Sequence, residues 1–194
     1  MMVDVAAAGL NSVADLLHER IVRLRKQYPS DTRRRVLIAL AGVPGSGKST
    51  ISAALMEALR DRNVDGVALV PMDGFHFPKS ALLEFSNPEQ ALQRRGGPFT
   101  FDADAFTKLV TDLRNSFVTR SDEPQLETRV PSFDHAIQDP IQDGLRISSA
   151  DRVVILEGNY LLLNEPPWST IAGLVDEKWF VDVPAEVAKQ RLIQ

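Results

Sequence analysis

A glycine-rich segment between residues 42 and 50 carries the clearest chemical signal in this sequence. Its letters, GVPGSGKST, match the pattern G-x-x-x-x-G-K-[ST] without exception. In that pattern the glycines let backbone N–H groups turn inward around phosphate oxygens, the lysine reaches the β- and γ-phosphates, and the hydroxyl is a Mg²⁺ ligand. A glycine-rich turn alone would not need Lys-Ser at this spacing. The expected nucleotide-binding residues are Gly42, Val43, Pro44, Gly45, Ser46, Gly47, Lys48, Ser49 and Thr50.

Two carboxylates stand where a phosphate-transferring site needs acids. Asp73 follows the apolar run 67–72, and Glu157 follows the apolar run 153–156. We expect Asp73 to accept the proton of an attacking hydroxyl, with Lys48 as the second catalytic residue, and Ser49 and Glu157 to hold Mg²⁺. Simpler interpretations stay open: Asp73 only caps a turn, or Glu157 is an exposed carboxylate at a strand end.

Composition limits the classes of protein to which this chain can belong. Of its 194 residues 44% are hydrophobic, which is enough for one globular domain with a substantial core. Its formal net charge of −4 provides no overall basic surface of the kind that nucleic-acid-binding proteins use. The absence of cysteine excludes disulfides, cysteine-based zinc sites and thiol catalysis. Any anion is therefore expected to be bound locally.

Neither membrane insertion nor secretion is indicated. No stretch approaches the roughly 20 apolar residues of a bilayer-spanning helix, and the start, residues 1–4, lacks the regions of a signal peptide. Basic residues between 20 and 35 could contact nucleic acid or acidic lipid, but the interspersed Glu19 and Asp31 favour a solvated face. We expect a cytoplasmic protein with no nucleic-acid or membrane partner, and a homodimer stays open.

The spacing of apolar residues indicates alternating helices and strands. Steps of three and four predict an amphipathic helix over residues 10–28, ended by Pro29. Short apolar runs predict strands over 36–41, 67–72, 153–156 and 178–183. The fold class is therefore α/β, a doubly wound, mostly parallel sheet of the P-loop NTPase kinase kind with a preceding N-terminal helix. Its site should lie beyond the carboxyl ends of the strands.

Further helices are expected between and after these strands. One begins near Lys48, one follows an N-cap at Asp102, and one opens at Pro184. The residues expected on the buried face of the second are Phe106, Leu109, Val110, Leu113 and Phe117. Residues 73–101 should form loops or short helices, and residues 118–150 are polar and rich in turns.

Missing motifs narrow the class of P-loop protein. The sequence has neither the D-x-x-G nor the N-K-x-D motif of Ras-like GTPases, and Gly96-Gly97 is a poor match to a transporter ATPase signature. The class that remains is an ATP-dependent kinase acting on a small hydroxyl-bearing metabolite, such as a nucleoside, a sugar or a pantothenate-like acid. The alternatives are a nucleotide-binding regulatory protein with little turnover and an ATP hydrolase coupled to a partner.

Five segments together resemble one known family. GVPGSGKST, MDGFH, RRGGPFTFD, PSFDH and LEGNYLLL occur in the order found in the uridine kinase and bacterial-type pantothenate kinase superfamily, from about residue 36 onward. The resemblance implies that ATP and Mg²⁺ are used and that Asp73 and Glu157 match the family's catalytic aspartate and metal-site glutamate. It also implies an acceptor pocket lined by Phe75, His76, Arg94, Arg95, Phe133 and His135.

The same resemblance suggests a division of the chain. Residues 1–35 are expected to form an N-terminal helix and basic linker, and residues 36–194 a P-loop kinase domain. Relatives continue into an arginine-bearing lid and an adenine-contacting segment, neither of which is recognisable here, although Arg191 could approach the phosphates. Weak closure over the nucleotide is therefore expected.

Overall fold

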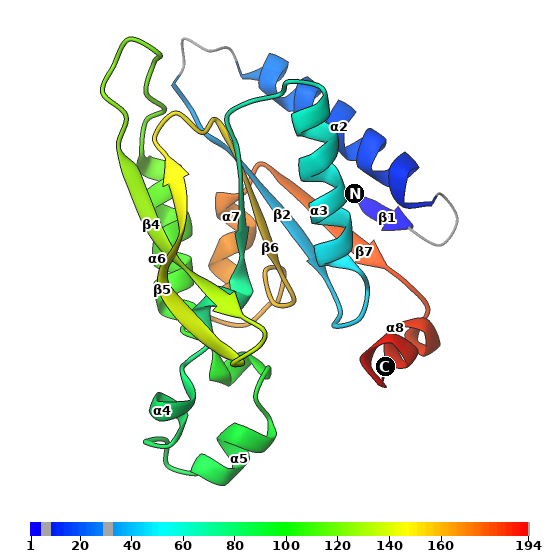
Figure 1. Ribbon diagram of the computed structural model, residues 1–194, viewed down its shortest axis with the longest axis vertical. Helices are drawn as coiled ribbons and strands as arrows, with labels where there is room; N and C mark the ends of the chain where they lie inside the picture. The colour runs from blue at the N-terminus through cyan, green and yellow to red at the C-terminus, as the bar shows by residue number, and fades with distance from the viewer. Residues whose placement is uncertain (5–8, 29–32, 194) are drawn as a thin grey trace.

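The computed structural model describes residues 1–4, 9–28 and 33–193 (Figure 1). Pro29, which we expected to end the first helix, and Asp31, which we expected on its solvated face, lie outside the described residues. Within the described part of the chain, no helix is both long and apolar enough to cross a membrane.

A five-stranded parallel sheet forms the centre of the molecule. Its strands lie in the order β1-β7-β2-β6-β3. They are β1 (Met2–Asp4), β2 (Val36–Gly42), β3 (Val67–Pro71), β6 (Val153–Gly158) and β7 (Glu177–Asp182). Every residue of β2 and β6 is buried, which explains why residues 36–41 and 153–156 are continuous apolar runs rather than alternating ones. The expected parallel sheet is confirmed, and β1 is an addition that the sequence did not signal.

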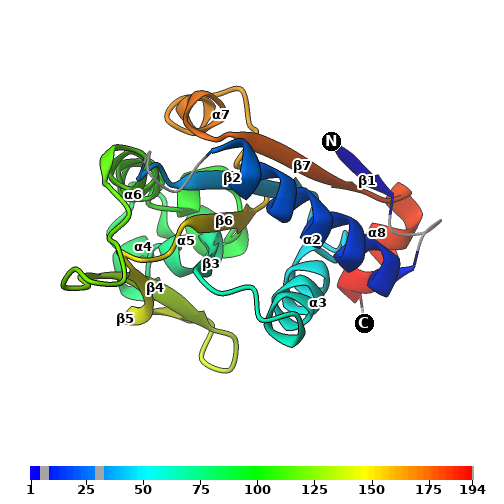
Figure 2. The same cartoon turned by 90° about the horizontal axis from the view of Figure 1, so that it is seen from above.

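Helices cover both faces of this sheet (Figure 2). On one face α2 (Leu10–Gln27) and α3 (Lys48–Asp61) pack against Ile38 and Leu40. On the other, α6 (Ala103–Asn115) and α7 (Ile171–Leu174) pack against Leu37 and Ala39. Because successive strand residues point to opposite faces, β2 supplies both cores, and the doubly wound arrangement is confirmed. The segment 1–35 contributes a strand and a helix to this same framework.

Several shorter elements extend beyond the carboxyl ends of the strands. They are the 3₁₀ turns η2 (Met72–Phe75), η3 (Pro98–Thr100) and η4 (Trp168–Thr170), and the helices α4 (Lys79–Leu82), α5 (Pro88–Gln93) and α8 (Ala185–Ile193). The expectation of loops and short helices over 73–101 is confirmed. Asp102 caps α6 as expected, because its side chain accepts a hydrogen bond of 2.9 Å from the Ala105 amide.

Two local expectations were wrong. Residues 118–150 contain an antiparallel hairpin of β4 (Glu127–Asp134) and β5 (Asp139–Ser148), not only turns. Only Val130 and Ile147 of this hairpin are buried, so it lacks the apolar pattern that identifies a strand. Phe117, expected on the buried face of α6, is 72% exposed, because α6 ends at Asn115 and the backbone of Ser116 is extended.

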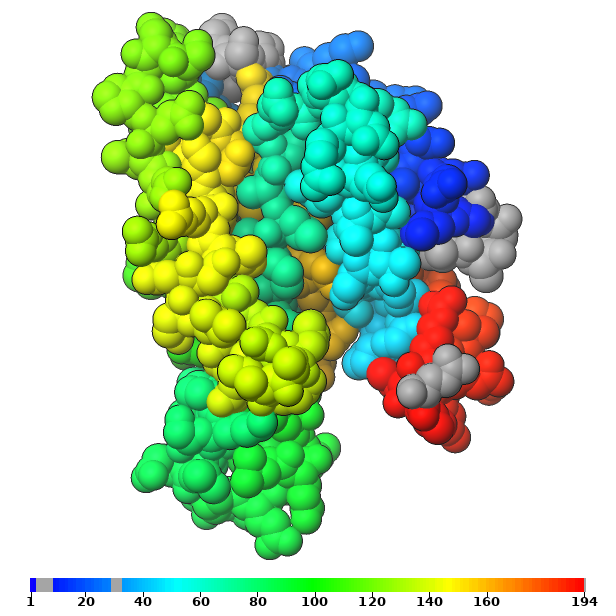
Figure 3. Space-filling view, viewed as in Figure 1, coloured from blue at the N-terminus to red at the C-terminus, as the bar shows by residue number. Residues whose placement is uncertain are grey.

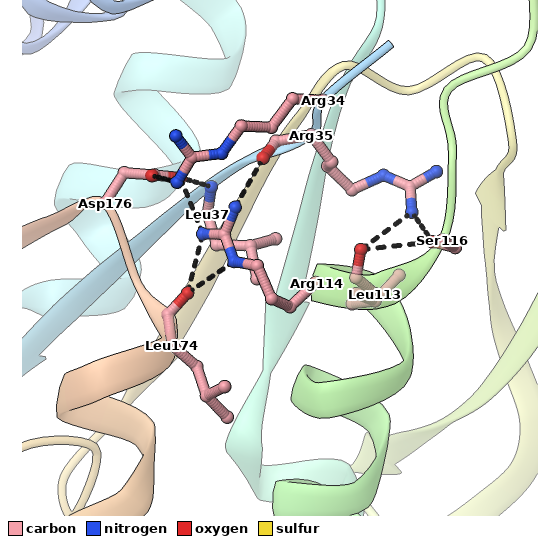
Figure 4. Close-up of polar contacts among 8 residues, drawn as sticks. All are labelled: Arg34, Arg35, Leu37, Leu113, Arg114, Ser116, Leu174 and Asp176. Atoms are coloured by element: carbon pink, nitrogen blue, oxygen red, sulfur yellow. Dashed lines mark hydrogen bonds and ion pairs between the residues drawn. The ribbon is translucent and has the colours of Figure 1, made fainter. Parts of the chain in front are cut away.

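A charged network ties the elements together at the amino end of the sheet (Figure 4). The Asp176 carboxylate is 2% exposed and accepts hydrogen bonds from the guanidinium groups of Arg34 and Arg114 and from the Leu37 amide. Arg114 also donates to the backbone carbonyl groups of Arg35 and Leu174. The network thereby joins β2 and α6 to the start of β7.

Candidate nucleotide and acceptor site

The phosphate loop joins the end of β2 to the start of α3. Gly45 and Gly47 have φ angles of 77° and 93°, in the left-handed region that favours glycine. A Cβ atom on Gly45 would lie 2.4 Å from the Ala188 carbonyl oxygen of α8, so this position also has no room for a side chain. The loop thus has the backbone conformation that turns N–H groups toward a phosphate at the N-terminus of α3.

Lys48 is the cation of this loop. Its side chain is largely buried, with the residue 7% exposed, and its Nζ donates a 3.1 Å hydrogen bond to the Val43 carbonyl oxygen. Burial lowers the pKa of Lys48, while the negative charges of Glu157 and Asp73 act in the opposite direction. The amine therefore lies within the electrostatic field of both carboxylates that the sequence singled out.

Glu157 lies near the carboxyl end of β6, between β2 and β3. In the sheet register it pairs with Leu40 of β2 and Pro71 of β3, so it stands beside both the phosphate loop and η2. Two hydroxyl groups of α3 orient it: Ser49 Oγ donates to Oε1 at 2.8 Å and Ser52 Oγ donates to Oε2 at 3.0 Å. Glu157 is only 7% exposed, unlike the freely solvated carboxylate of the simpler interpretation.

Sequence reasoning missed Ser52. The available signal was its spacing, because a residue three positions after Ser49 lies on the same face of a helix. Among the described residues there is no group of three or more His, Asp or Glu side chains that could hold a metal alone. The hydroxyl of Ser49 and the carboxylate of Glu157 still fit Mg²⁺, which takes one or two protein oxygens and completes its shell with phosphate and water.

Asp73 lies in η2, immediately after β3. A Cβ atom on its neighbour Gly74 would lie 2.2 Å from the Pro131 carbonyl oxygen, so η2 is packed directly against the backbone of β4. The Asp73 carboxylate caps no helix, and it has no hydrogen-bond partner among the described residues. The turn-capping interpretation is therefore not supported by these contacts, and the carboxylate is available to a ligand.

An aromatic wall of four side chains stands beside Asp73. The His76 ring lies 3.9 Å from the Phe101 ring and 4.8 Å from the Phe133 ring, measured between centroids, and Phe133 lies 5.2 Å from His135. His76 and Phe101 directly follow η2 and η3, and the other two side chains lie on the hairpin, so residues far apart in sequence meet here. His76, Phe133 and His135 were expected at the acceptor pocket, whereas Phe101 was not.

His76 is held in a neutral form by its surroundings. Burial lowers its pKa, and the charges of Arg95 and His135 lower it further. The hydrogen bond between Nδ1 and the Asp73 backbone carbonyl, 2.8 Å long, and the Asp73 charge act in the opposite direction without reversing the shift. At neutral pH the ring is therefore an uncharged polar group.

Arg95 contacts the aromatic wall, and its charge is paired. Its guanidinium carbon lies 5.8 Å from the Phe133 ring centroid, and Nη2 lies 2.6 Å from Asp139 Oδ1. The same guanidinium donates to the backbone carbonyl groups of Phe77 and Gln138. Asp139 is thus a member of the site that the sequence did not reveal, because its partner is 44 residues away in the chain.

The structure places the other two expected pocket residues differently. Phe75 is 7% exposed and packs edge-on against Phe106 at 4.9 Å, so its ring belongs to the core. Arg94 caps the C-terminus of α5, is exposed, and has no side-chain partner in the described part of the chain. Arg94 therefore lies near the site, but its contacts assign it no role there.

An open recess separates the phosphate loop from the aromatic side of the site. Figure 3 shows it between α8 and the lobe made by the hairpin with α4 and α5. A hollow of about 270 Å³ at the loop is lined by Gly45, Gly47, Lys48, Ser49, Thr50 and Arg191. Arg191 donates to the carbonyl groups of Gly45 and Ser46 at 3.3 and 3.2 Å, so the expected approach to the phosphate side is supported.

A phosphate loop between a buried parallel strand and a helix, with a carboxylate at the end of the adjacent strand, defines an ATP-binding P-loop kinase fold. The family model described as phosphoribulokinase / uridine kinase matches residues 37–194. This chain belongs to that family.

Individual relatives agree with this assignment. A Schizosaccharomyces pombe protein provisionally named a uridine kinase is 44% identical over 193 residues, which cover 99% of this chain and 77% of the relative. A crystal structure from Silicibacter sp. TM1040, provisionally described as a fructose transport system kinase, has a TM-score of 0.75 at 36% identity and covers 94% of this chain and 80% of its own.

A third comparison supports the fold alone. The crystal structure of YFH7 from Saccharomyces cerevisiae, provisionally described as a P-loop kinase with a circular permutation, has a TM-score of 0.75 at 23% identity. The match covers 92% of this chain and 84% of YFH7. The family match and the 44% identical relative make the chain a kinase of the uridine kinase type, and the acceptor must be argued from its own residues.

Proposed function

We propose that this chain is an ATP-dependent phosphotransferase that moves the γ-phosphate to a hydroxyl group of a small metabolite such as a nucleoside, a sugar or a pantothenate-like acid. The observation that carries the proposal is the Asp73 carboxylate. It has no hydrogen-bond partner among the described residues, it acts electrostatically on Lys48, and it stands beside the aromatic wall. A carboxylate in that place fits a base for an acceptor hydroxyl.

The nucleotide side of the reaction is assigned to the phosphate loop. The backbone N–H groups and the N-terminus of α3 bind the phosphates, and Lys48 exchanges its contact with the Val43 carbonyl for the β- and γ-phosphates. Ser49 and Glu157 are the residues that would hold Mg²⁺. When bound, the ion neutralises charge on the phosphate oxygens.

The acceptor side is assigned to η2 and the aromatic wall. The acceptor hydroxyl oxygen forms a bond to the γ-phosphorus while the bond to the β,γ-bridging oxygen breaks, and ADP leaves with that electron pair. Asp73 accepts the hydroxyl proton as the attack proceeds. His76, Phe133 and His135 orient the acceptor so that the reacting atoms are in line.

Asp73→Asn tests this assignment. Purified protein is incubated with ATP, Mg²⁺ and pooled hydroxyl-bearing metabolites, and both ADP and phosphorylated products are measured. We expect wild-type transfer to an acceptor, and a kcat about two to four orders of magnitude lower in the variant with unchanged ATP affinity. The matched control is Asp104→Asn, which removes an exposed carboxylate in the first turn of α6.

Three results would count against the proposal. Near-normal transfer by Asp73→Asn would limit Asp73 to shaping η2. ATP binding without ADP formation in any acceptor pool would favour the nucleotide-binding regulatory protein. ADP release at the same rate with and without acceptors, and no phosphorylated product, would favour the ATP hydrolase.

A further inference from the structure

A mostly buried ion pair neutralises the arginine on the acceptor side of the site. Arg95 is the arginine that contacts the aromatic wall, and its guanidinium is bound by the Asp139 carboxylate at 2.6 Å. Both side chains are mostly buried, with 14% and 27% of their surfaces exposed. Asp139 also accepts a hydrogen bond from the Lys79 amide at 3.0 Å, which fixes its orientation. The pair is therefore built into the fold rather than formed by chance on the surface.

The two terminal nitrogens of the Arg95 guanidinium both donate hydrogen bonds, whereas its Nε is buried and has no partner among the described residues. Its guanidinium donates to the carbonyl oxygens of Phe77 and Gln138 in addition to the carboxylate. A carboxylate or phosphate on a substrate could bind Arg95 only by displacing Asp139 or by lying next to its negative charge. Like charges placed side by side in a partly buried site repel strongly, so the pair disfavours anionic acceptors.

Asp139 neutralises the positive charge of Arg95, and the other titratable groups around the aromatic wall do not replace that charge. His76 is neutral because burial and nearby positive charge lower its pKa. The Lys79 ammonium group donates to the Ile137 carbonyl oxygen at 2.7 Å, and Asp134 adds a further carboxylate on the same hairpin. Asp73 places another negative charge at the reacting end. Arg94 is an exposed cation with no side-chain partner among the described residues, and it lies outside the ion pair.

We propose, resting on the kinase function proposed above, that Asp139 is a specificity-determining residue that makes this site select uncharged acceptors. The favoured class is an alcohol without a carboxylate or phosphate, such as a nucleoside or a free sugar, whose apolar or planar face lies against the aromatic wall. Acids such as pantothenate and sugar phosphates are disfavoured. The transfer step itself is unchanged, because Asp139 acts through Arg95 and not on the reacting atoms.

Pairs of acceptors with similar structures and different charges measure this selectivity. We would compare kcat/KM for pantothenol with pantothenate, ribulose with ribulose 5-phosphate, and glycerol with glycerate, which differ mainly in the anionic group. The wild-type protein should prefer the uncharged member of each pair that it accepts. Asp139→Asn keeps the shape and one acceptor oxygen but releases the charge of Arg95, and should shift the ratio toward the anionic member by at least about ten-fold.

A control on the same hairpin removes the same charge elsewhere. Asp143→Asn affects a carboxylate 3.9 Å from Arg129, with both side chains more than half exposed, and should leave every ratio unchanged. A wild-type preference for the anionic members, or an unaltered ratio in Asp139→Asn, would overturn the proposal.

A binding measurement keeps the proposal testable if no acceptor is turned over. Sulfate is titrated calorimetrically into protein whose phosphate loop is saturated with ADP and Mg²⁺. We expect no binding by the wild-type protein at millimolar sulfate, binding by Asp139→Asn, and none by the double variant Asp139→Asn/Arg95→Gln. Wild-type sulfate binding that Arg95→Gln abolishes, or absence of binding by Asp139→Asn, would overturn the role of the pair. Failure of the kinase function would instead show in the absence of phosphorylated product.

Discussion

The two ends of the parallel sheet both gather charged side chains, but they use them differently. At the amino end, the Asp176 carboxylate is bound by Arg34, Arg114 and a backbone amide, so each charge faces its counter-charge (Figure 4). At the carboxyl end, Lys48 holds one backbone carbonyl, and Asp73 has no hydrogen-bond partner in the described part of the chain. Charges satisfied by the fold stabilise it, whereas charges with spare hydrogen-bonding capacity indicate where a ligand binds.

The largest expected effect is the loss of the cation at the carboxyl end. Lys48→Met keeps most of the side-chain volume but removes the group assigned to the β- and γ-phosphates. We expect kcat/KM to fall by about three orders of magnitude, the range for losing a preorganised charge at a transition state. Thermal stability should not fall, because burial already penalises the lysine charge, as its lowered pKa shows.

Lys108→Met is the matched control for this variant. Lys108 is an exposed lysine of α6 whose surface pair with Asp112 contributes little to stability. Steady-state kinetics and thermal melts of both variants compare the two lysines. Equal activity of folded Lys48→Met and wild-type protein would show that the loop does not use this lysine.

The opposite outcome is expected at the amino end. Asp176→Asn removes the buried carboxylate that pairs with the mostly buried Arg114 and with Arg34, whose side chain is 42% exposed. We expect the free energy of unfolding to fall by about 3 kcal/mol, the lower part of the range for breaking a buried ion pair. The kcat of the molecules that stay folded should not change. Urea unfolding monitored by circular dichroism, with kinetics well below the transition, separates the two quantities, and a kinetic defect without lost stability would contradict the comparison.

The sequence revealed one end of the sheet better than the other. The strand-to-helix turn at Gly42 and the strand ends at Asp73 and Glu157 were predictable, because local motifs and apolar runs mark them. The Asp176 network was not, since Arg34 and Asp176 are 142 residues apart and meet only through the strand order. The hairpin was missed for the related reason that one buried residue in each strand gives no period. Asp139 lies on this hairpin and was missed with it, so the acceptor side was predicted less completely than the phosphate side.

A smaller effect is expected from a residue that only positions a site carboxylate. Ser52→Ala removes the hydrogen bond to Glu157 Oε2 while leaving the one from Ser49 to Oε1. The loss of one such hydrogen bond costs about 1 kcal/mol. We therefore expect the Mg²⁺ concentration for half-maximal activity to rise by a few-fold, with kcat at saturating Mg²⁺ nearly retained. Ser12→Ala, on the exposed side of α2, is the control, and unchanged Mg²⁺ dependence in Ser52→Ala would limit Ser52 to helix packing.

The smallest expected effect is a pH dependence of stability that arises from the aromatic wall. Burial lowers the pKa of His76 below its ordinary value of 6.5, helped by the charges of Arg95 and His135 and opposed by Asp73. Between the lowered value and 6.5 the unfolded chain therefore binds more protons at this residue than the folded protein does. By linkage, the free energy of unfolding must fall as the pH drops below about 6.5, until the folded protein also takes up the proton.

His76→Phe isolates this contribution, because a phenyl ring preserves the contacts with Phe101 and Phe133 but does not titrate. We expect the variant to lose less stability than the wild-type protein between pH 7.5 and pH 5.5, where the range is chosen to bracket the ordinary histidine value. The folded and unfolded states differ at His76 by less than one bound proton per molecule. The resulting change in the free energy of unfolding is therefore small beside the other effects. Urea unfolding of both proteins across the range measures it. Parallel plots of stability against pH would mean that a charged imidazole is tolerated in the aromatic wall. That result would weaken the distinction between the amino end of the sheet, whose charges are paired, and the carboxyl end, whose polar groups are available to a ligand.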